Sequence, residues 1–249
     1  MSFFSYNLSF FEIVIFYAAA LLVGMAKTGV QGAGMLAVPI VASLFGGITS
    51  SGVLLPILCM ADAFGIMYYH RHASWERLKN LFPTTAIGTI VGVILGSQIN
   101  DKTFTVIMAV SIVVSIAVML WLEKSNRKSV PSSAAFAAFI GLVAGFASMV
   151  GNLAGPLMAV YFLSMRLSKH TLIGTAAWFF LVINLFKIPF HIFVWNTIST
   201  ETFIMDLTTL PVILAGAFLG MWIVKKFSEE SYRWFVIVTT LIAAALMFL

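Results

Sequence analysis

Apolar runs long enough to cross a lipid bilayer recur along this sequence. The clearest cover residues 50–69, 81–99, 104–122 and 232–249. A helix rises 1.5 Å per residue, so about 20 apolar residues cross a hydrocarbon core about 30 Å thick. Hydrophobic residues make up 61% of the chain and charged residues 9%, which is more apolar surface than a water-soluble domain can bury. The sequence therefore predicts an all-α polytopic membrane protein.

Polar breaks divide the chain into ten apolar segments. They cover residues 10–27, 34–46, 50–69, 81–99, 104–122, 134–148, 153–165, 171–195, 207–225 and 232–249. If the N-terminus lies outside, almost every Lys and Arg between segments falls on the cytoplasmic side, with Lys102 as the exception. The first basic residue is Lys27, so we expect no cleaved signal peptide. The pattern predicts a multi-pass protein of the cell inner membrane with both termini outside.

The second half of the sequence repeats features of the first half. Gly24, Ala26, Ala33, Gly34 and Leu36 align at a constant offset with Gly145, Ala147, Ala154, Gly155 and Leu157. The pattern Pro-x4-Gly-x3-Gly occurs at residues 83–92 and again at 211–220, and Asp62 aligns near Asn184. Each half holds five segments, an odd number, so the second must be inverted. We expect a first repeat at 1–122, a cytoplasmic linker at 123–133 and a second, inverted repeat at 134–249.

Two segments, 34–46 and 153–165, are too short to cross the bilayer alone. Each follows a glycine-rich stretch at a corresponding place in the two halves. Glycines permit tight turns, and the first backbone N–H groups of the helix that follows have no partner within the helix. Two such helix starts would present positive dipole ends to an anion. Close helix packing is the alternative role for these glycines, and we favour it for Gly88, Gly92, Gly216 and Gly220.

Polar residues within the apolar segments complete the predicted site. Asn184, Lys187 and His191 recur at i, i+3 and i+7 and so share one helix face. The predicted substrate-binding residues are Lys27, Gln31, Gly32, Gly34, Asn152, Gly155, Asn184, Lys187 and His191. Asp62 would balance charge or exchange a proton. The alternative is a buried Asp62–Lys187 ion pair that holds the two halves together.

The glycine-rich hairpins at 24–39 and 145–156 resemble those of the TauE/SafE family of membrane transporters. The two Pro-x4-Gly-x3-Gly helices and the loop Arg71-His-Ala-Ser-Trp-Glu-Arg extend the resemblance over essentially the whole chain. It differs in detail, because Asn152 and Leu153 stand where glycine is common in the family. The resemblance implies anion transport, with sulfur-containing oxyanions or organosulfonates such as sulfite or sulfoacetate as the leading substrates.

These features together predict a secondary transporter that moves a small anion by alternating access at a midplane site. The expected partners are the anion and the lipid bilayer, and a homodimer is compatible with the prediction. We expect no cofactor, metal site or nucleic-acid partner. A cation or metal-ion transporter centred on Asp62 is the main alternative, and a membrane assembly protein is a weaker one. An enzyme is not expected, because the chain lacks His-Glu-x-x-His, Gly-x-Ser-x-Gly and nucleotide-binding motifs.

Overall fold

The computed structural model describes residues 2–4, 6–28, 30–69, 73–124, 134–164 and 169–224, with the single residues 226, 238 and 242. Within them lie ten helices and one two-stranded antiparallel pair, which confirms the all-α class. The strands are β1 (Ser2–Phe3) and β2 (Tyr6–Asn7). The helices are α1 (Phe10–Lys27), α2 (Gln31–Phe45), α3 (Gly47–Tyr69), α4 (Trp75–Gly96), α5 (Asp101–Lys124), α6 (Ala134–Gly151), α7 (Ala154–Ser164), α8 (Lys169–Phe193), α9 (Thr200–Leu207) and α10 (Leu210–Val224).

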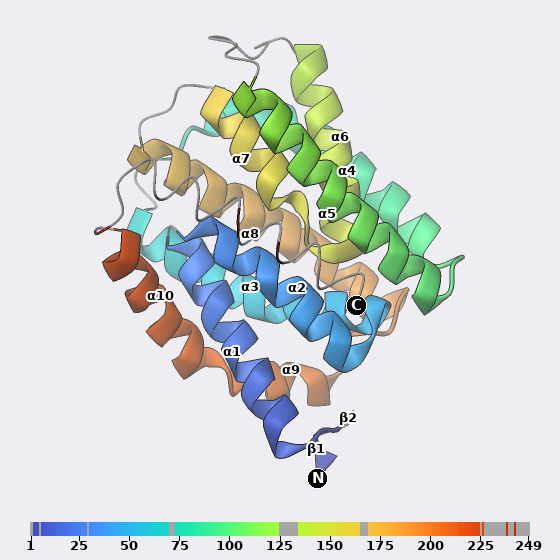
Figure 1. Ribbon diagram of the computed structural model, residues 1–249. Helices are drawn as coiled ribbons and strands as arrows, with labels where there is room; N and C mark the ends of the chain where they lie inside the picture. The colour runs from blue at the N-terminus through green and yellow to red at the C-terminus, as the bar shows by residue number, and fades with distance from the viewer. Residues whose placement is uncertain are drawn as a thin grey trace.

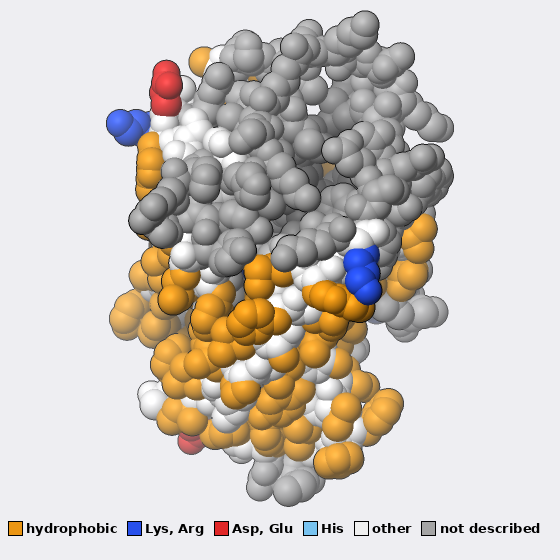
Figure 2. Space-filling model, turned by 90° about the vertical axis from the view of Figure 1, so that its left-hand side faces the viewer, with side chains coloured by type: hydrophobic (Ala, Val, Ile, Leu, Met, Phe, Trp, Pro, Cys, Tyr) orange, Lys and Arg blue, Asp and Glu red, His pale blue; other side chains and the backbone are white. Residues whose placement is uncertain are grey.

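The described helices fit a lipid environment. Five of them, α1, α3, α4, α6 and α8, are long and apolar enough to cross a membrane, and α9 with α10 adds a sixth candidate that bends by 45°. Large apolar side chains are exposed on α4, α5 and α10. Figure 2 shows one face on which hydrophobic side chains cover most of the described surface. The structure therefore confirms a multi-pass membrane protein.

Several boundaries differ from the sequence prediction, and two of the differences involve polar residues. Helix α4 begins at Trp75, so the basic residues Arg77 and Lys79 lie on its first turns and not in a loop. The expected segment 207–225 is preceded by a separate helix, α9, which the sequence reading missed. Ser199 caps α9 by accepting from the Thr202 N–H and donating its own N–H to the Thr202 side chain. The expected tenth segment, 232–249, lies outside the described residues apart from residues 238 and 242.

The two short helices occur where the glycine-rich stretches predict them. Helix α2 has 15 residues and α7 has 11, so they rise about 22 Å and about 16 Å. Both are shorter than a hydrocarbon core about 30 Å thick. The break before α7 includes Asn152, which adopts the left-handed conformation with φ 58°. The turn at Asn152 therefore places its amide side chain and the backbone polar groups of the break among apolar helices.

Close glycine contacts pack helices from opposite halves of the chain. Helix α1 packs against α10, and α4 packs against α6, while α3 and α8 lie together between these pairs (Figure 1). A Cβ atom at Gly24 or Gly216 would collide with the facing backbone of α10 or α1, and one at Gly145 or Gly88 would collide with that of α4 or α6. Gly92 and Gly220 likewise lie against facing helices. The predicted packing role of Gly88, Gly92, Gly216 and Gly220 is confirmed.

Candidate binding site

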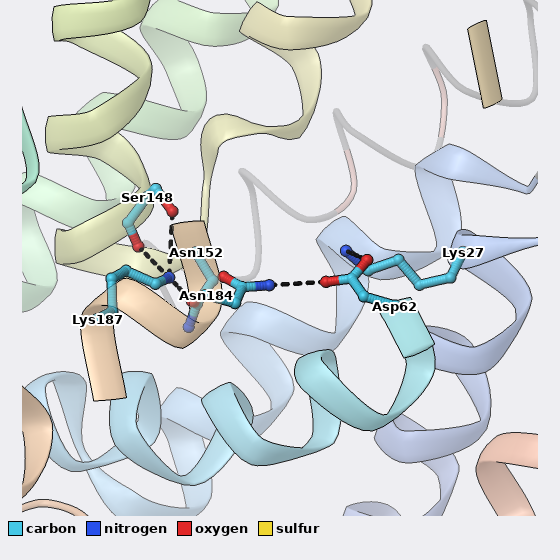
Figure 3. A network of polar contacts seen from close by, with 6 residues as sticks. All are labelled: Lys27, Asp62, Ser148, Asn152, Asn184 and Lys187. Atoms are coloured by element: carbon cyan, nitrogen blue, oxygen red, sulfur yellow. Dashed lines mark hydrogen bonds and ion pairs between the residues drawn. The ribbon is translucent and has the colours of Figure 1, made fainter. Parts of the chain in front are cut away.

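A network of polar side chains crosses the apolar interior where α1, α3, α6 and α8 meet. Figure 3 shows its six members and the two contact groups that they form. They are Lys27, Asp62, Ser148, Asn152, Asn184 and Lys187. Polar groups buried within a membrane protein are costly, so these residues are candidates for a functional site.

The first group is centred on the Asp62 carboxylate of α3. Its Oδ1 lies 2.8 Å from Lys27 Nζ of α1, and its Oδ2 accepts a hydrogen bond of 2.8 Å from Asn184 Nδ2 of α8. Asp62 is fully buried, and the Lys27 side chain is 16% exposed. Lys27 Nζ also lies 4.5 Å from the centroid of the Phe180 ring. In this group each unit charge is opposed by another.

The second group is centred on the Lys187 ammonium of α8. Lys187 Nζ donates to Asn152 Oδ1 at 2.6 Å, to Ser148 Oγ at 3.1 Å and to the Ser148 carbonyl at 3.0 Å. Asn152 Nδ2 in turn donates to the Ser51 carbonyl of α3 at 3.1 Å. Lys187 is fully buried. All three acceptors are neutral, and no described carboxylate forms an ion pair with Lys187, so a protonated Lys187 has hydrogen-bond acceptors but no counterion.

The alternative of an Asp62–Lys187 ion pair is wrong. Asp62 pairs with Lys27, because Lys27 lies at the C-terminal end of α1, within reach of the middle of α3. Lys187 turns instead toward the end of α6. Asn184 and Lys187 are three residues apart on α8, so this helix carries one member of each group (Figure 3).

His191 lies one turn beyond Lys187 on the same buried face of α8. The expected shared face is confirmed, because Asn184, Lys187 and His191 are exposed by 3%, 0% and 0%. One ring nitrogen of His191, Nδ1, lies 2.8 Å from Thr197 Oγ1. The other, Nε2, is buried without a hydrogen-bond partner among the described residues. A buried ring nitrogen in this state is available to a ligand.

The remaining predicted site residues lie at the helix breaks. Gln31 and Gly32 open α2, and the Gln31 side chain lies outside what the structure describes. A Cβ at Gly34 would lie 2.8 Å from Ala26 Cβ, so Gly34 is a packing position against α1. At Gly155, in the first turn of α7, a Cβ would have no atom within 4 Å. Gly155 therefore faces open space close to the Asn152 turn.

The sequence reading missed Ser148, which gives Lys187 two of its three acceptors. The signal was present in the aligned hairpins, where Gly24-Met-Ala-Lys27 matches Gly145-Phe-Ala-Ser148. Ser148 thus occupies the position that corresponds to Lys27. Across the described residues, no group of three His, Cys, Asp or Glu side chains could hold a metal ion.

Comparison with known proteins places the chain. The family model of the sulfite exporter TauE/SafE matches residues 16–247, nearly the whole sequence. The chain belongs to the TauE/SafE family. The match includes both hairpins and every member of the polar network, so the resemblance inferred from the sequence is confirmed. No curated protein and no solved structure matches the chain. As a TauE/SafE protein, it is a membrane transport protein of an anion-exporting family.

Proposed function

We propose that this protein is a secondary transporter of a small anion, a sulfur-containing oxyanion or organosulfonate such as sulfite or sulfoacetate. The charge of the buried network carries the proposal. Lys27 and Lys187 contribute two positive charges and Asp62 one negative charge, which leaves one positive charge in excess. An uncompensated buried ion costs several kcal/mol in real proteins. An anion beside Lys187 would remove that cost, and the family supports the same sign of charge.

The groups around Lys187 suit an oxyanion. Lys187 and the Asn152 amide would donate hydrogen bonds to the anion. His191 Nε2, which has no hydrogen-bond partner among the described residues, would bind it as well. The first turn of α7 adds backbone N–H groups, and the open space at Gly155 would admit the ligand to them. Gln31 and Gly32 would supply the corresponding turn of α2. In this proposal Asn184 orients Asp62, and Asp62 balances the charge of Lys27.

Paired glycine contacts support an inverted repeat and hence alternating access. Gly24 meets Ile213 of α10, and its aligned counterpart Gly145 meets Thr85 of α4. Thr85 and Ile213 are also counterparts, since each precedes the first glycine of its Pro-x4-Gly-x3-Gly pattern by three residues. Equivalent helices thus meet at equivalent residues, which supports repeats at 1–122 and 134–249. We propose that the two halves expose the network to each side in turn, in an inner-membrane protein with both termini outside.

A cation substrate is less well supported. It would be expected to bind Asp62, but both oxygens of that carboxylate already contact other residues. Lys27, a positive charge, would have to leave first. The structure favours an anion at Lys187 over a cation at Asp62.

Ligand binding to the purified protein in detergent tests the proposal. The panel holds sulfite, sulfate, thiosulfate, sulfoacetate, taurine, acetate, phosphate and chloride, with sodium and zinc as cation controls. A ligand at 100 times its Kd stabilises the folded state by about 2.7 kcal/mol, so its effect on Tm should grow with dose. We expect a sulfur oxyanion or a sulfonate to raise Tm most.

Two variants test whether the stabilising ligand binds at Lys187. Lys187→Met should abolish the ligand-dependent rise in Tm, whereas Lys102→Met, on the exposed first turn of α5, should keep it. Uptake of the stabilising anion into proteoliposomes should follow the same order. Stabilisation by sodium or zinc alone would refute anion transport, and an unchanged response in Lys187→Met would refute the site.

A further inference from the structure

A second fully buried carboxyl group lies on α9, away from the network. Asp206 has no exposed surface, and neither of its carboxyl oxygens has a hydrogen-bond or ion-pair partner among the described residues. Asp62, the other fully buried carboxylate that the structure describes, has both Lys27 and Asn184. A carboxylate buried without partners is costly, and its neutral, protonated form avoids most of that cost.

Within the part of the chain that the structure describes, no hydrogen bond or ion pair joins Asp206 to a positively charged side chain. Helix α9 packs on α3, whose first ionisable groups, Cys59 and Asp62, lie more than two turns from its N-terminal end. The described titratable groups of β2, α1, the start of α5 and α9 are Tyr6, Glu12, Tyr17, Asp101, Lys102 and Glu201, and the Asp101 carboxylate accepts from the first N–H groups of α3. Burial raises the pKa of the Tyr6 hydroxyl, and an ionised Asp206 would raise it further. Tyr17 donates to or accepts from Thr208, and Glu12 caps α1 through the Ser9 N–H.

In the proposed repeat, the position that corresponds to Asp206 carries an apolar side chain. Asp206 precedes Pro211 by five residues, and the residue that precedes Pro83 by five is Leu78. Leu78 is also fully buried. The corresponding position in the other half of the chain is therefore filled by an apolar side chain of similar size. A costly buried ionisable group, where the corresponding position holds leucine, points to a function.

Asp206 also lies at a bend. Its carbonyl accepts from the Thr209 N–H at 3.0 Å and from Thr209 Oγ1 at 2.6 Å, immediately before the 45° turn into α10. Figure 1 shows β1, β2 and α9 at the same end of the molecule. At this end the centroids of the Tyr6 and Phe45 rings lie 4.7 Å apart. Because Asp206 is fully buried, water can reach its carboxyl group only if the elements around it move apart.

We propose that Asp206 is a proton-binding site, protonated in the conformation described and releasing its proton when the α9–α10 bend exposes it to water. The second ligand of the transporter would then be a proton. The inference goes beyond the proposed function and holds for any transported substrate. It separates the role of Asp206 from that of Asp62, which serves as a fixed counterion.

The pH dependence of thermal stability tests the proposal without any transport assay. Full-length wild type, Asp206→Asn and Glu201→Gln would be unfolded in detergent between about pH 5 and about pH 9. Because the folded state holds the proton, its stability should be highest at low pH and fall as the pH rises. Asp206→Asn imitates the protonated group and should lose most of this fall. Glu201→Gln, on the exposed face of the same helix, should keep it.

Three results would each contradict a proton-binding role for Asp206. A fall with pH in Asp206→Asn as steep as in wild type would overturn the proposal. So would an Asn variant that is unfolded even at low pH, where the neutral side chain should be tolerated. Infrared difference spectra add a direct measurement, since a protonated carboxyl band at neutral pH should vanish in both Asp206→Asn and Asp206→Leu. A spectrum in which no such band is lost would also refute it.

Discussion

The two buried lysines of the network differ in what opposes their charge. Lys27 lies 2.8 Å from the Asp62 carboxylate, whereas Lys187 is held by one amide oxygen, one hydroxyl and one backbone carbonyl. A buried ion pair gains little net stability, but it is costly to break. A buried cation among neutral acceptors keeps its field, and that field is available to a ligand. In the proposed function, Lys27 therefore serves chiefly structure and Lys187 chiefly binding.

The same comparison shows how two similar halves differ. In the first half the lysine is on the helix before the break and its partner, Asp62, is on α3. In the second half Ser148 stands at the position that aligns with Lys27, and the lysine is on α8, the counterpart of α3 in the proposed repeat. Each half therefore joins the end of its first helix to the middle of its third, with opposite placement of the cation. Under the proposed repeat, one subsite is neutral and the other is positive.

Removal of Lys27 should cause the largest loss of stability. Lys27→Met leaves the fully buried Asp62 without its counterion, and such changes cost about 3 to 5 kcal/mol in buried pairs. Since the Lys27 side chain is 16% exposed and Asp62 can take up a proton, we expect about 2 to 4 kcal/mol. Thermal or denaturant unfolding in detergent measures the loss.

The double variant Lys27→Met/Asp62→Asn is the control. It removes both charges, and the new amide oxygen at position 62 can still accept the hydrogen bond that Asn184 donates. Most of the lost stability should therefore return. A double variant no more stable than Lys27→Met would show that packing, and not the ion pair, sets the cost.

Lys187→Met should change stability far less than Lys27→Met. No described carboxylate loses its counterion, and methionine avoids the cost of burying a charge. The acceptors on Ser148 and Asn152 each lose one bond, so we expect a net change within about 2 kcal/mol of zero. Unfolding of the ligand-free protein checks this, beside the loss of anion binding expected above. A loss of stability as large as that of Lys27→Met would show that Lys187 also holds the fold together.

Substitutions at Asn152 should separate anchoring of Lys187 from backbone strain. Asn152→Gly keeps a residue that tolerates φ 58° but removes the bonds to Lys187 and Ser51, which should cost about 1 to 2 kcal/mol. Asn152→Ala loses the same bonds and adds about 1 kcal/mol for the left-handed backbone. Equal stabilities of the Gly and Ala variants would contradict the strain, and a Gly variant equal to wild type would contradict the anchoring.

The sequence was sufficient for the helical class, the two short helices and the shared face of Asn184, Lys187 and His191. Each depends on local information, either the length of an apolar run or the spacing of polar residues along one helix. The partner of Asp62 could not be predicted, because Lys27 and Lys187 were both available and only tertiary packing decides between them. Helix α9 and Asp206 were missed for another reason, since the polar residues of α9 interrupt the apolar pattern that located the other helices.

Gly155 offers the smallest expected change in stability and probes the open space at the first turn of α7. Nothing lies within 4 Å of a Cβ built there, so Gly155→Ala should alter stability by no more than about 1 kcal/mol, toward higher stability, because alanine favours helix. Gly145→Ala is the matched control, because its Cβ would collide with the Thr85 carbonyl and should destabilise by about 1 to 3 kcal/mol. If the anion occupies the open space near α7, Gly155→Ala should weaken the ligand-dependent rise in Tm while leaving the ligand-free Tm almost unchanged. An unaltered ligand response, even with leucine at position 155, would place the anion elsewhere around Lys187.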